Sequence, residues 1–517
     1  MKNSKLTLSL IAVCCLATFA NADKEPTSPE YKKAQEKSKP KAKRTLNGNM
    51  TLVYNKLPQK ANNLTGALTK GEFYGRMRMN TFMWDWDSPD NITNRDNKVF
   101  GVGGSLIYKT APLYGLSATT GLYVATSPFS SFNEDDADVK YVKSGKDTFS
   151  RYDVKNNNSW TMAVLGEAYL QYDIAKTSVK IGRQLVDTPL TASNDTKMIP
   201  NAFEGLTVVN KDIADTTLTG AYLTRQKLRD HTSFHNLLTF KDSAGDSWGN
   251  NDDNGMHKGL TYARLHPLGL DDSALGILWA SNKSIKNLKL DLTYGTVPDL
   301  LSYGVAEANY KLPLNDKYSL GFGAKHMQQF DDGAGAIGGA SLGGSLATVP
   351  AGIPKSGYKD PKSLDGSVSM AKVALSDGIF KAQLGYSHVA DKADIVAPWR
   401  VFPTGGYTRA MAQTNWYANT DATMLELTYD FGKAKIVNGL KVMGRYAIQD
   451  FDNAKQTAGV QADSKVIHVD VVKQLTPCMD ARFRMALVDA DKRTLGSNAG
   501  KDVDSYNEFR AEINYMF

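Results

Sequence analysis

The chain has 517 residues, of which 42% are hydrophobic, 22% charged and 10% aromatic, and its formal net charge is +7. So many aromatic side chains exclude a chain that is disordered throughout. Beyond the N-terminus, no run of apolar residues approaches the length of about 18 that a membrane-spanning helix needs. This excludes a helical membrane protein but not a membrane β-barrel, whose strands are apolar on one face only.

Most of the positive charge lies near the N-terminus. Residues 1–22 carry a net charge of +2 and residues 23–45 carry +4, which leaves +1 for residues 46–517. The body of the chain is therefore close to neutral, and a broad basic surface that would bind nucleic acid is not expected.

The N-terminus has the three parts of a secretory signal peptide. Lys2 and Lys5 precede an apolar stretch at residues 6–19, and a small-x-small sequence follows at residues 20–22. We therefore expect export from the cytoplasm, with cleavage after Ala22.

The segment after the signal peptide is rich in Lys, Pro, Glu and Ser and has no apolar periodicity, which predicts a flexible stretch at residues 23–45. Cys14 and Cys15 leave with the signal peptide, so Cys478 stands alone and no intramolecular disulfide is expected. A lipoprotein signal at Cys14 fits less well, because Val13 before it is not a small residue.

From about residue 72 onward the chain repeats one pattern, in which a segment of alternating apolar and polar residues is followed by a turn. Alternation with period two is typical of β-strands with one apolar face. No repeat of fixed length appears, which disfavours propellers and solenoids. The predicted strands number eighteen: 72–86, 97–109, 115–126, 159–173, 176–184, 203–213, 216–227, 272–282, 286–296, 300–312, 317–330, 366–377, 378–390, 420–432, 438–451, 463–474, 479–491 and 504–517.

The connections between these segments alternate between short and long. Turns such as residues 174–175 alternate with long loops such as residues 228–271. This asymmetry is typical of outer-membrane barrels, which have tight periplasmic turns and long outer loops. The expected fold is all-β, a transmembrane antiparallel barrel of about 18 strands within residues 46–517. Residues 46–57 and 258–266 are two further strand candidates.

The two faces of each predicted strand differ in polarity. Leu425 and Leu427 alternate with Glu426, for example. A charge at the bilayer midplane costs about 2–4 kcal/mol, so charged side chains are expected to face the lumen. By this parity the lumen candidates are basic at Arg76, Arg78, Lys180, Lys289, Lys381, Lys441, Arg445, Arg482, Arg484 and Arg510, and acidic at Glu167, Asp291, Glu426, Asp430, Asp470, Glu508 and Glu512.

Several short patches carry a resemblance to a known family. Residues 180–184 (Lys-Ile-Gly-Arg-Gln), 188–190 (Thr-Pro-Leu) and 200–205 (Pro-Asn-Ala-Phe-Glu-Gly) resemble the OprD-type outer-membrane porins. Residues 108–115 do so as well, and the terminal Phe517 resembles the signature read by the barrel-assembly machinery.

The resemblance implies a monomeric barrel in the outer membrane of a Gram-negative bacterium, surrounded by lipid and lipopolysaccharide. It implies a channel for small hydrophilic solutes such as amino acids, peptides or organic acids. The loop at residues 185–202 would fold into the pore as a charged constriction, to which it would add Asp187, Asn194, Asp195 and Lys197.

A basic row that faces acidic groups across a narrowing would orient a solute with a carboxylate and attract anions. Arg183 belongs to the family motif, but its parity matches that of Ile181, so it faces the lumen only if a bulge at Gly182 turns it inward. The residues expected to set selectivity are Arg76, Arg78, Lys180, Arg183, Asp187, Asp195, Lys441, Arg445, Arg482, Arg484 and Arg510.

Other interpretations stay open at this stage. The related trimeric major porins of some curved bacteria, which can bind calcium, fit the same pattern. Two further alternatives are a structural or adhesive barrel with a blocked bore and a barrel enzyme. The enzyme would need a Ser–His pair on the lipid face, and no serine stands at a fixed offset from His326, His388 or His468.

No phosphate loop, C-x-x-C or H-E-x-x-H motif is present, and the Gly-rich stretch at residues 333–344 predicts a flexible outer loop, so we expect neither an enzyme nor a cofactor. The four-residue spacing of His231 and His235 lacks a supporting carboxylate motif, and the acidic pairs Asp135-Asp136 and Asp252-Asp253 match no calcium loop. No metal site is therefore predicted.

Overall fold

A computed structural model of the chain describes residues 44–54, 58–87, 96–130, 139, 142, 145–238, 256–344, 357–411, 414–455, 462–491 and 505–517. The predicted signal peptide, the predicted flexible segment up to residue 43 and the two acidic pairs considered for calcium lie outside these residues.

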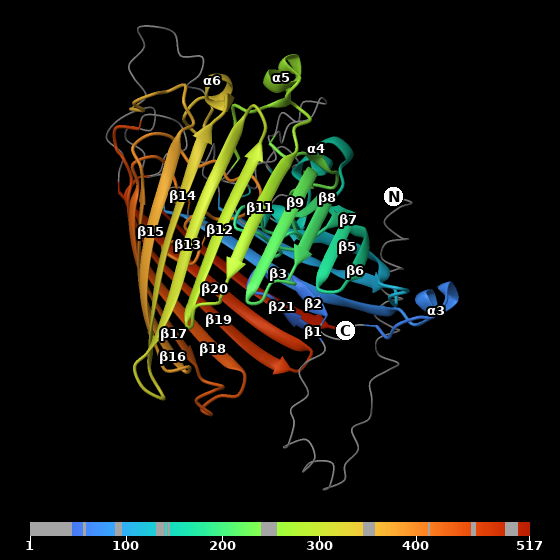
Figure 1. Ribbon diagram of the computed structural model, residues 1–517. Coiled ribbons are helices and arrows are strands. Elements are labelled where there is room, and N and C mark those ends of the chain that lie inside the picture. The colour runs from blue at the N-terminus through green and yellow to red at the C-terminus, as the bar shows by residue number, and fades with distance from the viewer. Residues whose placement is uncertain are drawn as a thin grey trace.

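The described strands form a closed antiparallel barrel (Figure 1). Eighteen long strands make its wall, and the two-residue β10 (His235–Asn236) adds to the end of β9. The first seven are β3 (Glu72–Trp86), β4 (Asn97–Lys109), β5 (Leu116–Ser130), β6 (Thr161–Ile174), β7 (Thr177–Gln184), β8 (Ala202–Asn210) and β9 (Thr216–Lys227). The other eleven are β11 (Leu275–Asn282), β12 (Leu288–Val297), β13 (Leu301–Pro313), β14 (Ser319–Asp331), β15 (Gly366–Ser376), β16 (Phe380–Val389), β17 (Asp421–Asp430), β18 (Leu440–Asp450), β19 (Ser464–Thr476), β20 (Met479–Ala490) and β21 (Tyr506–Met516).

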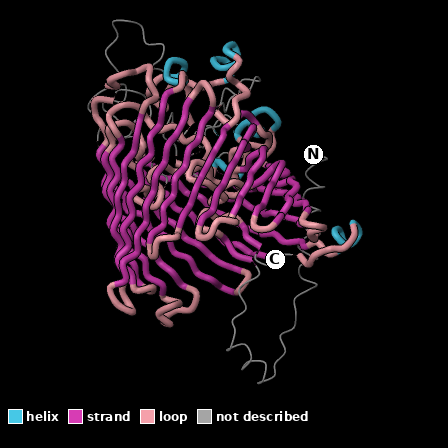
Figure 2. The backbone as a smooth tube through the Cα atoms, in the orientation of Figure 1, coloured by secondary structure: helices cyan, strands magenta, loops and turns pink. Residues whose placement is uncertain are grey.

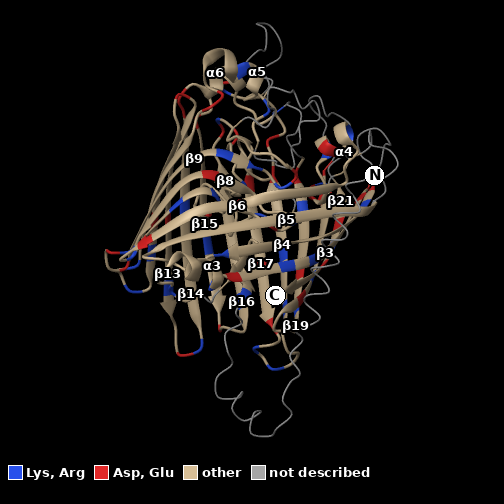
Figure 3. Ribbon diagram, turned by 90° about the vertical axis from the view of Figure 1, so that its right-hand side faces the viewer, with Lys and Arg blue, Asp and Glu red and all other residues tan. Residues whose placement is uncertain are grey.

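Each of the eighteen predicted segments matches one strand of this wall, with ends that differ by a few residues. The predicted parity is confirmed in the exposure of the side chains. In β17, Leu425 and Leu427 are 42% and 44% exposed on the outside, whereas Glu426 between them is 7% exposed. Figure 3 shows β4 and β5 without charged residues along their middle portions.

The barrel closes between the last strand and the first. β21 pairs with β3 in a register that places Met516 opposite Arg76. The terminal residue continues this ladder, because the Gly75 amide donates to the Phe517 carbonyl at 3.0 Å and the Phe517 amide donates back at 3.1 Å. Closure removes the unpaired strand edges that hydrocarbon would penalise.

The two rims of the barrel differ (Figure 2). Short turns such as residues 175–176 and 377–379 lie at one rim, and long loops lie at the other. The long loops carry short helices: η2 (Lys146–Thr148), α4 (Arg151–Asn157), α5 (Tyr262–Leu265), η3 (His266–Leu268) and α6 (Ala334–Gly338). Helix α3 (Leu64–Thr69) lies at the short-turn rim, where the Ala111 amide donates to the Ala67 carbonyl. No helix in the described part of the chain has the length and apolar character needed to cross a bilayer.

The N-terminal segment contains a hairpin that is not part of the barrel sheet. β1 (Arg44–Leu46) pairs with β2 (Leu52–Tyr54) as a separate two-stranded sheet, so the predicted boundary between residues 45 and 46 falls inside a structural unit. The candidate strand at 46–57 is thus represented by β2, and the candidate at 258–266 is a helical turn.

The lipid-facing assignment predicts a position-specific cost of charge. Leu425→Arg should lower the free energy of unfolding by about 2–4 kcal/mol, because the side chain enters hydrocarbon near mid-strand. Met443→Arg, on the lumen face of the neighbouring strand β18, should cost much less because water solvates it. Denaturant unfolding in detergent or lipid vesicles measures both, and equal losses would contradict the assignment of faces.

Candidate pore constriction

The loop between β7 and β8, residues 185–201, folds into the barrel, and its anchor is Asp195. This carboxylate is 2% exposed and forms ion pairs with the guanidinium groups of Arg76 and Arg78 on β3. Arg78 Nη1 lies 2.8 Å from Asp195 Oδ1 and also donates to the Asp195 carbonyl at 3.1 Å. Arg78 forms a second ion pair with Glu512 on β21. The inward loop that the family resemblance implied is therefore present at this position.

These contacts assign Arg76, Arg78 and Asp195 a structural part in the constriction. All three side chains are buried, and none of them lines the cavity described below. Burial raises the pKa of the Asp195 carboxyl, although the two guanidinium groups act in the opposite direction. The three residues fix the loop against the wall and do not present free charge to a solute.

A second loop also enters the barrel, and its inward path was not predicted from the sequence. The segment between β16 and β17, residues 390–420, meets the first loop where the Ala192 amide donates to the Trp399 carbonyl at 2.9 Å. Thr191 and Arg400 form an isolated antiparallel bridge beside this contact. Trp399 and Trp416 are each 1% exposed and belong to the largest buried apolar cluster, which lies beneath the long loops. The apolar run at residues 395–399 was the available signal for this burial.

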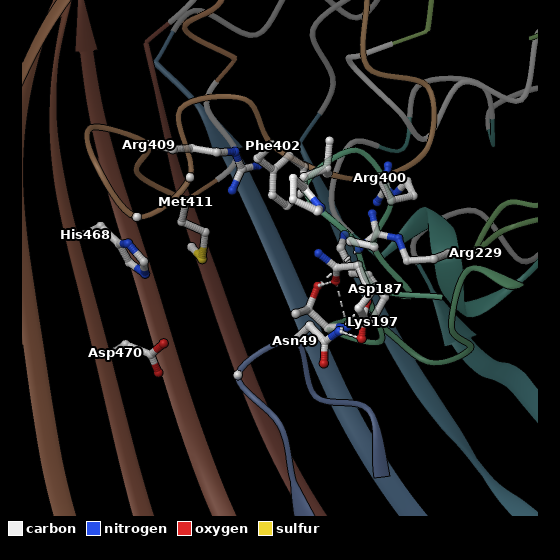
Figure 4. A pocket seen from close by; sticks show the side chains of 18 of the residues that line it. Asn49, Asp187, Lys197, Arg229, Arg400, Phe402, Arg409, Met411, His468 and Asp470 are labelled. Carbon is white, nitrogen blue, oxygen red and sulfur yellow. Dashed lines mark hydrogen bonds between the residues drawn. The ribbon is translucent and has the colours of Figure 1, made fainter. Parts of the chain in front are cut away.

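The two loops and the wall enclose a cavity of about 810 Å³ (Figure 4). Its lining has eleven lysines and arginines against five acidic residues. The basic residues are Lys146, Lys197, Arg229, Lys289, Lys325, Arg400, Arg409, Arg445, Arg482, Arg484 and Arg510, and the acidic residues are Asp187, Asp291, Glu307, Asp470 and Glu508.

The arginine cluster of the last strands is brought together as predicted. Arg445, Arg482, Arg484 and Arg510 line the cavity from β18, β20 and β21. Arg484 and Arg510 stand directly opposite each other in the register of β20 and β21. Like charges in such positions repel, so this pair concentrates positive charge on one side of the cavity.

The acidic residues near this cluster neutralise only part of its positive charge. Asp470 on β19 forms an ion pair with Arg482 and lies 3.4 Å from Arg484 Nε. Glu508 lies 2.6 Å from Arg510 Nη2. Asp470 thus serves two guanidinium groups, and the cluster keeps an excess of positive charge.

His468 on β19 adds a neutral polar group to the same wall. Its side chain is 5% exposed and lines the cavity, where Figure 4 shows it beside Asp470. Neither ring nitrogen has a hydrogen-bond partner among the residues that the structure describes. Buried polar atoms are normally satisfied, so the ring is available to water or to a solute.

The remaining predicted site residues lie in different places. Asp187 lines the cavity from the inward loop. Lys180 lies over the Tyr169 ring, with Nζ 4.9 Å from the ring centroid. Lys441 is the second residue of β18 and its side chain is exposed near the short-turn rim. Neither lysine lines the cavity.

Arg183 does not turn toward the cavity. The pairing of β7 with both neighbours runs through Gly182 without a register shift, so β7 lacks the bulge that was needed. Arg183 therefore keeps the parity of Ile181, which is 59% exposed on the outer face. Arg183 Nε donates to Glu204 Oε1 at 2.7 Å, and Arg183 Cζ lies 4.4 Å from the centroid of the Phe234 ring. The inward orientation considered for Arg183 is wrong.

A Ser–His contact on the outer face was not predicted from the sequence. His326 Nδ1 lies 2.9 Å from Ser369 Oγ, because β14 and β15 place the two residues opposite each other. His388 on β16 contacts Asp421 at 3.0 Å instead. His326 thus pairs with a serine and His388 with a carboxylate, so these two histidines form separate pairs rather than one Ser–His–carboxylate relay.

The histidine pair considered for a metal has an aromatic contact, with the His231 and His235 ring centroids 4.8 Å apart. Within the described ranges, no three His, Cys, Asp or Glu side chains gather as metal ligands.

The anchor at Asp195 makes a stability prediction. Asp195→Asn keeps the shape but leaves Arg76 without a carboxylate partner, and loss of one partner of a buried ion pair costs about 3–5 kcal/mol. We expect a correspondingly earlier unfolding transition in denaturant. Asp316→Asn, at an exposed turn position, is the matched control and should change little. Identical transitions for the two variants would contradict the anchoring role.

Comparisons with known proteins agree with this architecture. The family model described as outer membrane porin, OprD family, matches residues 143–517. The crystal structure of Pseudomonas aeruginosa OccK9 (OpdG) is similar with a TM-score of 0.65 and 17% identity, over 87% of this chain and 99% of that chain. Acinetobacter baumannii OccAB3 has a TM-score of 0.64 and 15% identity, over 87% and 99%. A BenF-like porin from Pseudomonas fluorescens Pf-5 also has a TM-score of 0.64 and 15% identity, over 87% and 100%.

Among curated proteins, none matches the chain. The family match nevertheless covers more than half of the residues and extends through the inward loop and the arginine cluster. Porins of this family are non-enzymatic channels of the Gram-negative outer membrane that admit small solutes. The chain therefore belongs to the OprD family of outer-membrane porins.

Proposed function

We propose that this porin is a passive channel that favours small hydrophilic anions, above all solutes with a carboxylate, such as amino acids, peptides and organic acids. The observation that carries the proposal is the lining of the cavity, where eleven basic residues outnumber five acidic ones. A positive lining inside low-dielectric walls raises the local concentration of anions and their rate of entry.

The distribution of charge around the bore supports an oriented passage. The excess of arginine lies on β18, β20 and β21, whereas β12 and β13, on the far side of the strand order, pair their charges more evenly. On that side, Lys289 lies 2.6 Å from Asp291, and Tyr407 donates to Glu307 at 3.0 Å. A solute with a carboxylate would therefore turn this group toward the arginine wall.

The contacts available there suit a carboxylate. Guanidinium groups bind carboxylates with paired, charge-assisted hydrogen bonds. Arg484 and Arg510 face each other across neighbouring strands, and His468 adds a ring whose nitrogens have no hydrogen-bond partner in the described part of the chain. Weak binding by several such groups permits both entry and release, as conduction requires.

Removal of the wall charges tests the proposal. Arg482→Gln together with Arg484→Gln should lower the chloride-over-potassium permeability ratio about twofold, because the excess of basic residues falls from six to four. Reversal potentials in planar bilayers under a salt gradient measure the ratio. Lys433→Gln, in the exposed turn after β17, is the control and should leave it unchanged. An unchanged ratio in the double variant would refute the arginine wall as the selectivity element.

Lys197 predicts a pH dependence of the same ratio. It is a loop residue at the cavity, 3.5 Å from Asp147, and burial together with Arg510 and Arg229 lowers its pKa to about 7 despite the attraction of Asp147 and Glu508. The ammonium is charged below this pKa and neutral above it, so anion preference should fall as pH rises through neutrality.

The same reversal-potential measurement, repeated across neutral pH, checks this expectation. Lys197→Met removes the titrating charge, so its anion preference should be low and should not show this step. A step of the same size in the parent and in Lys197→Met would assign the pH dependence to another group.

A further inference from the structure

The hairpin of β1 and β2 lies inside the barrel, at the floor of the cavity. It enters from the short-turn rim, where the rings of Tyr54 and Tyr74 stack with centroids 4.8 Å apart and 11° between their planes. Its tip contributes Gly48 and Asn49 to the cavity lining. Figure 4 shows Asn49 reaching toward Asp187 from below.

The tip has a fixed shape of its own. The Asn47 amide donates to the Thr51 carbonyl and the Met50 amide donates to the Asn47 carbonyl, both at 2.9 Å. Asn49 Oδ1 accepts from the Thr51 hydroxyl at 2.7 Å and from the Thr51 amide at 3.2 Å. These bonds satisfy the turn internally and leave the Asn49 amide nitrogen free to point outward.

The tip joins three parts of the constriction. Asn49 Nδ2 donates to both oxygens of Asp187 at 3.1 Å, and the Asn49 carbonyl accepts from the Asp195 amide at 2.8 Å. The Met50 carbonyl accepts from Arg76 Nη1 at 2.8 Å. Met50 Sδ lies 2.9 Å from Arg482 Nη1 in the arginine wall. Met50 and Thr51 are each 4% exposed, so the tip is packed into the lumen.

We propose that the hairpin of residues 44–54 is a selectivity element that completes the constriction from the short-turn side, with Asn49 as the residue that sets its width. The inference rests on the proposed channel function and deepens it. The inward loop narrows the pore from one side, and the hairpin holds Asp187 and Asp195 of this loop in place while it occupies part of the bore.

The first test removes residues 44–54 from the full chain and measures single-channel conductance in planar bilayers. A two-stranded ribbon with its side chains is about 10 Å thick, so its removal should raise conductance about twofold. Heat-modifiable migration in gels reports whether the variant barrel is folded. Thr69→Ala, in α3 outside the bore, is a matched control that should conduct like the parent.

The second test uses point variants that keep the fold. Asn49→Asp retains the oxygen that accepts from Thr51 but places a carboxylate against Asp187, so it should release the tip and raise conductance. Asp187→Asn, added to Asn49→Asp, places the amide donor on the inward loop and the carboxylate acceptor on the hairpin tip, so the hydrogen bond forms with the two roles exchanged. The double variant also has the same number of charges as the parent. We expect the double variant to recover the parental conductance.

The outcomes separate this inference from the proposed function. A folded deletion variant with parental conductance would overturn the role of the hairpin, as would failure of the double variant to recover. The reversal potential of the parent is an independent readout: an absence of anion preference would refute the anion channel while an increase in conductance on deletion would still support the hairpin.

Discussion

The structure depends on the cost of placing charge and unpaired backbone groups in hydrocarbon. This cost closes the strand ladder from β21 back to β3 and sorts side chains by parity, so that Leu425 is 42% exposed on the outside while Glu426 beside it is 7% exposed. The wall must therefore deliver its charged side chains to the lumen. The sorting that makes the wall stable therefore also concentrates charge along the inside of the barrel.

The charges in the lumen then divide according to the partners that they find. Arg76 and Arg78 meet carboxylates from the inward loop and from β21, and they are buried in structural ion pairs. Arg484 and Arg510 face each other, and Arg484 shares Asp470 with Arg482. The two sets have the same residue type and the same orientation, so the supply of partners, and not the parity, decides which arginine anchors the loop and which one lines the cavity.

This distinction marks the limit of what the sequence could predict. Period-two alternation is a local signal, so all eighteen strands and the grouping of Arg445, Arg482, Arg484 and Arg510 on neighbouring strands were predicted. Contacts that depend on register across strands were not, as the Ser369–His326 pair shows. The loop at residues 390–420 was missed because its entry depends on tertiary packing around Trp399, although its apolar run was visible.

The hairpin shows why a wide barrel recruits segments from outside its wall. Side chains of the wall leave much of an eighteen-stranded bore unfilled, so loops or terminal segments must narrow it. A segment suited to this place must supply hydrogen-bonding or ionic partners for the charged side chains of the lumen. It must also form the hydrogen bonds of its own backbone groups. The tip at Asn47–Thr51 does both, since its turn is bonded internally and its outward groups meet Arg76 and Asp187. The turn closes between Asn47 and Met50 and has its left-handed residue at Met50, with φ 66°, so the Asn47-Gly48 dipeptide marked a turn without fixing its type.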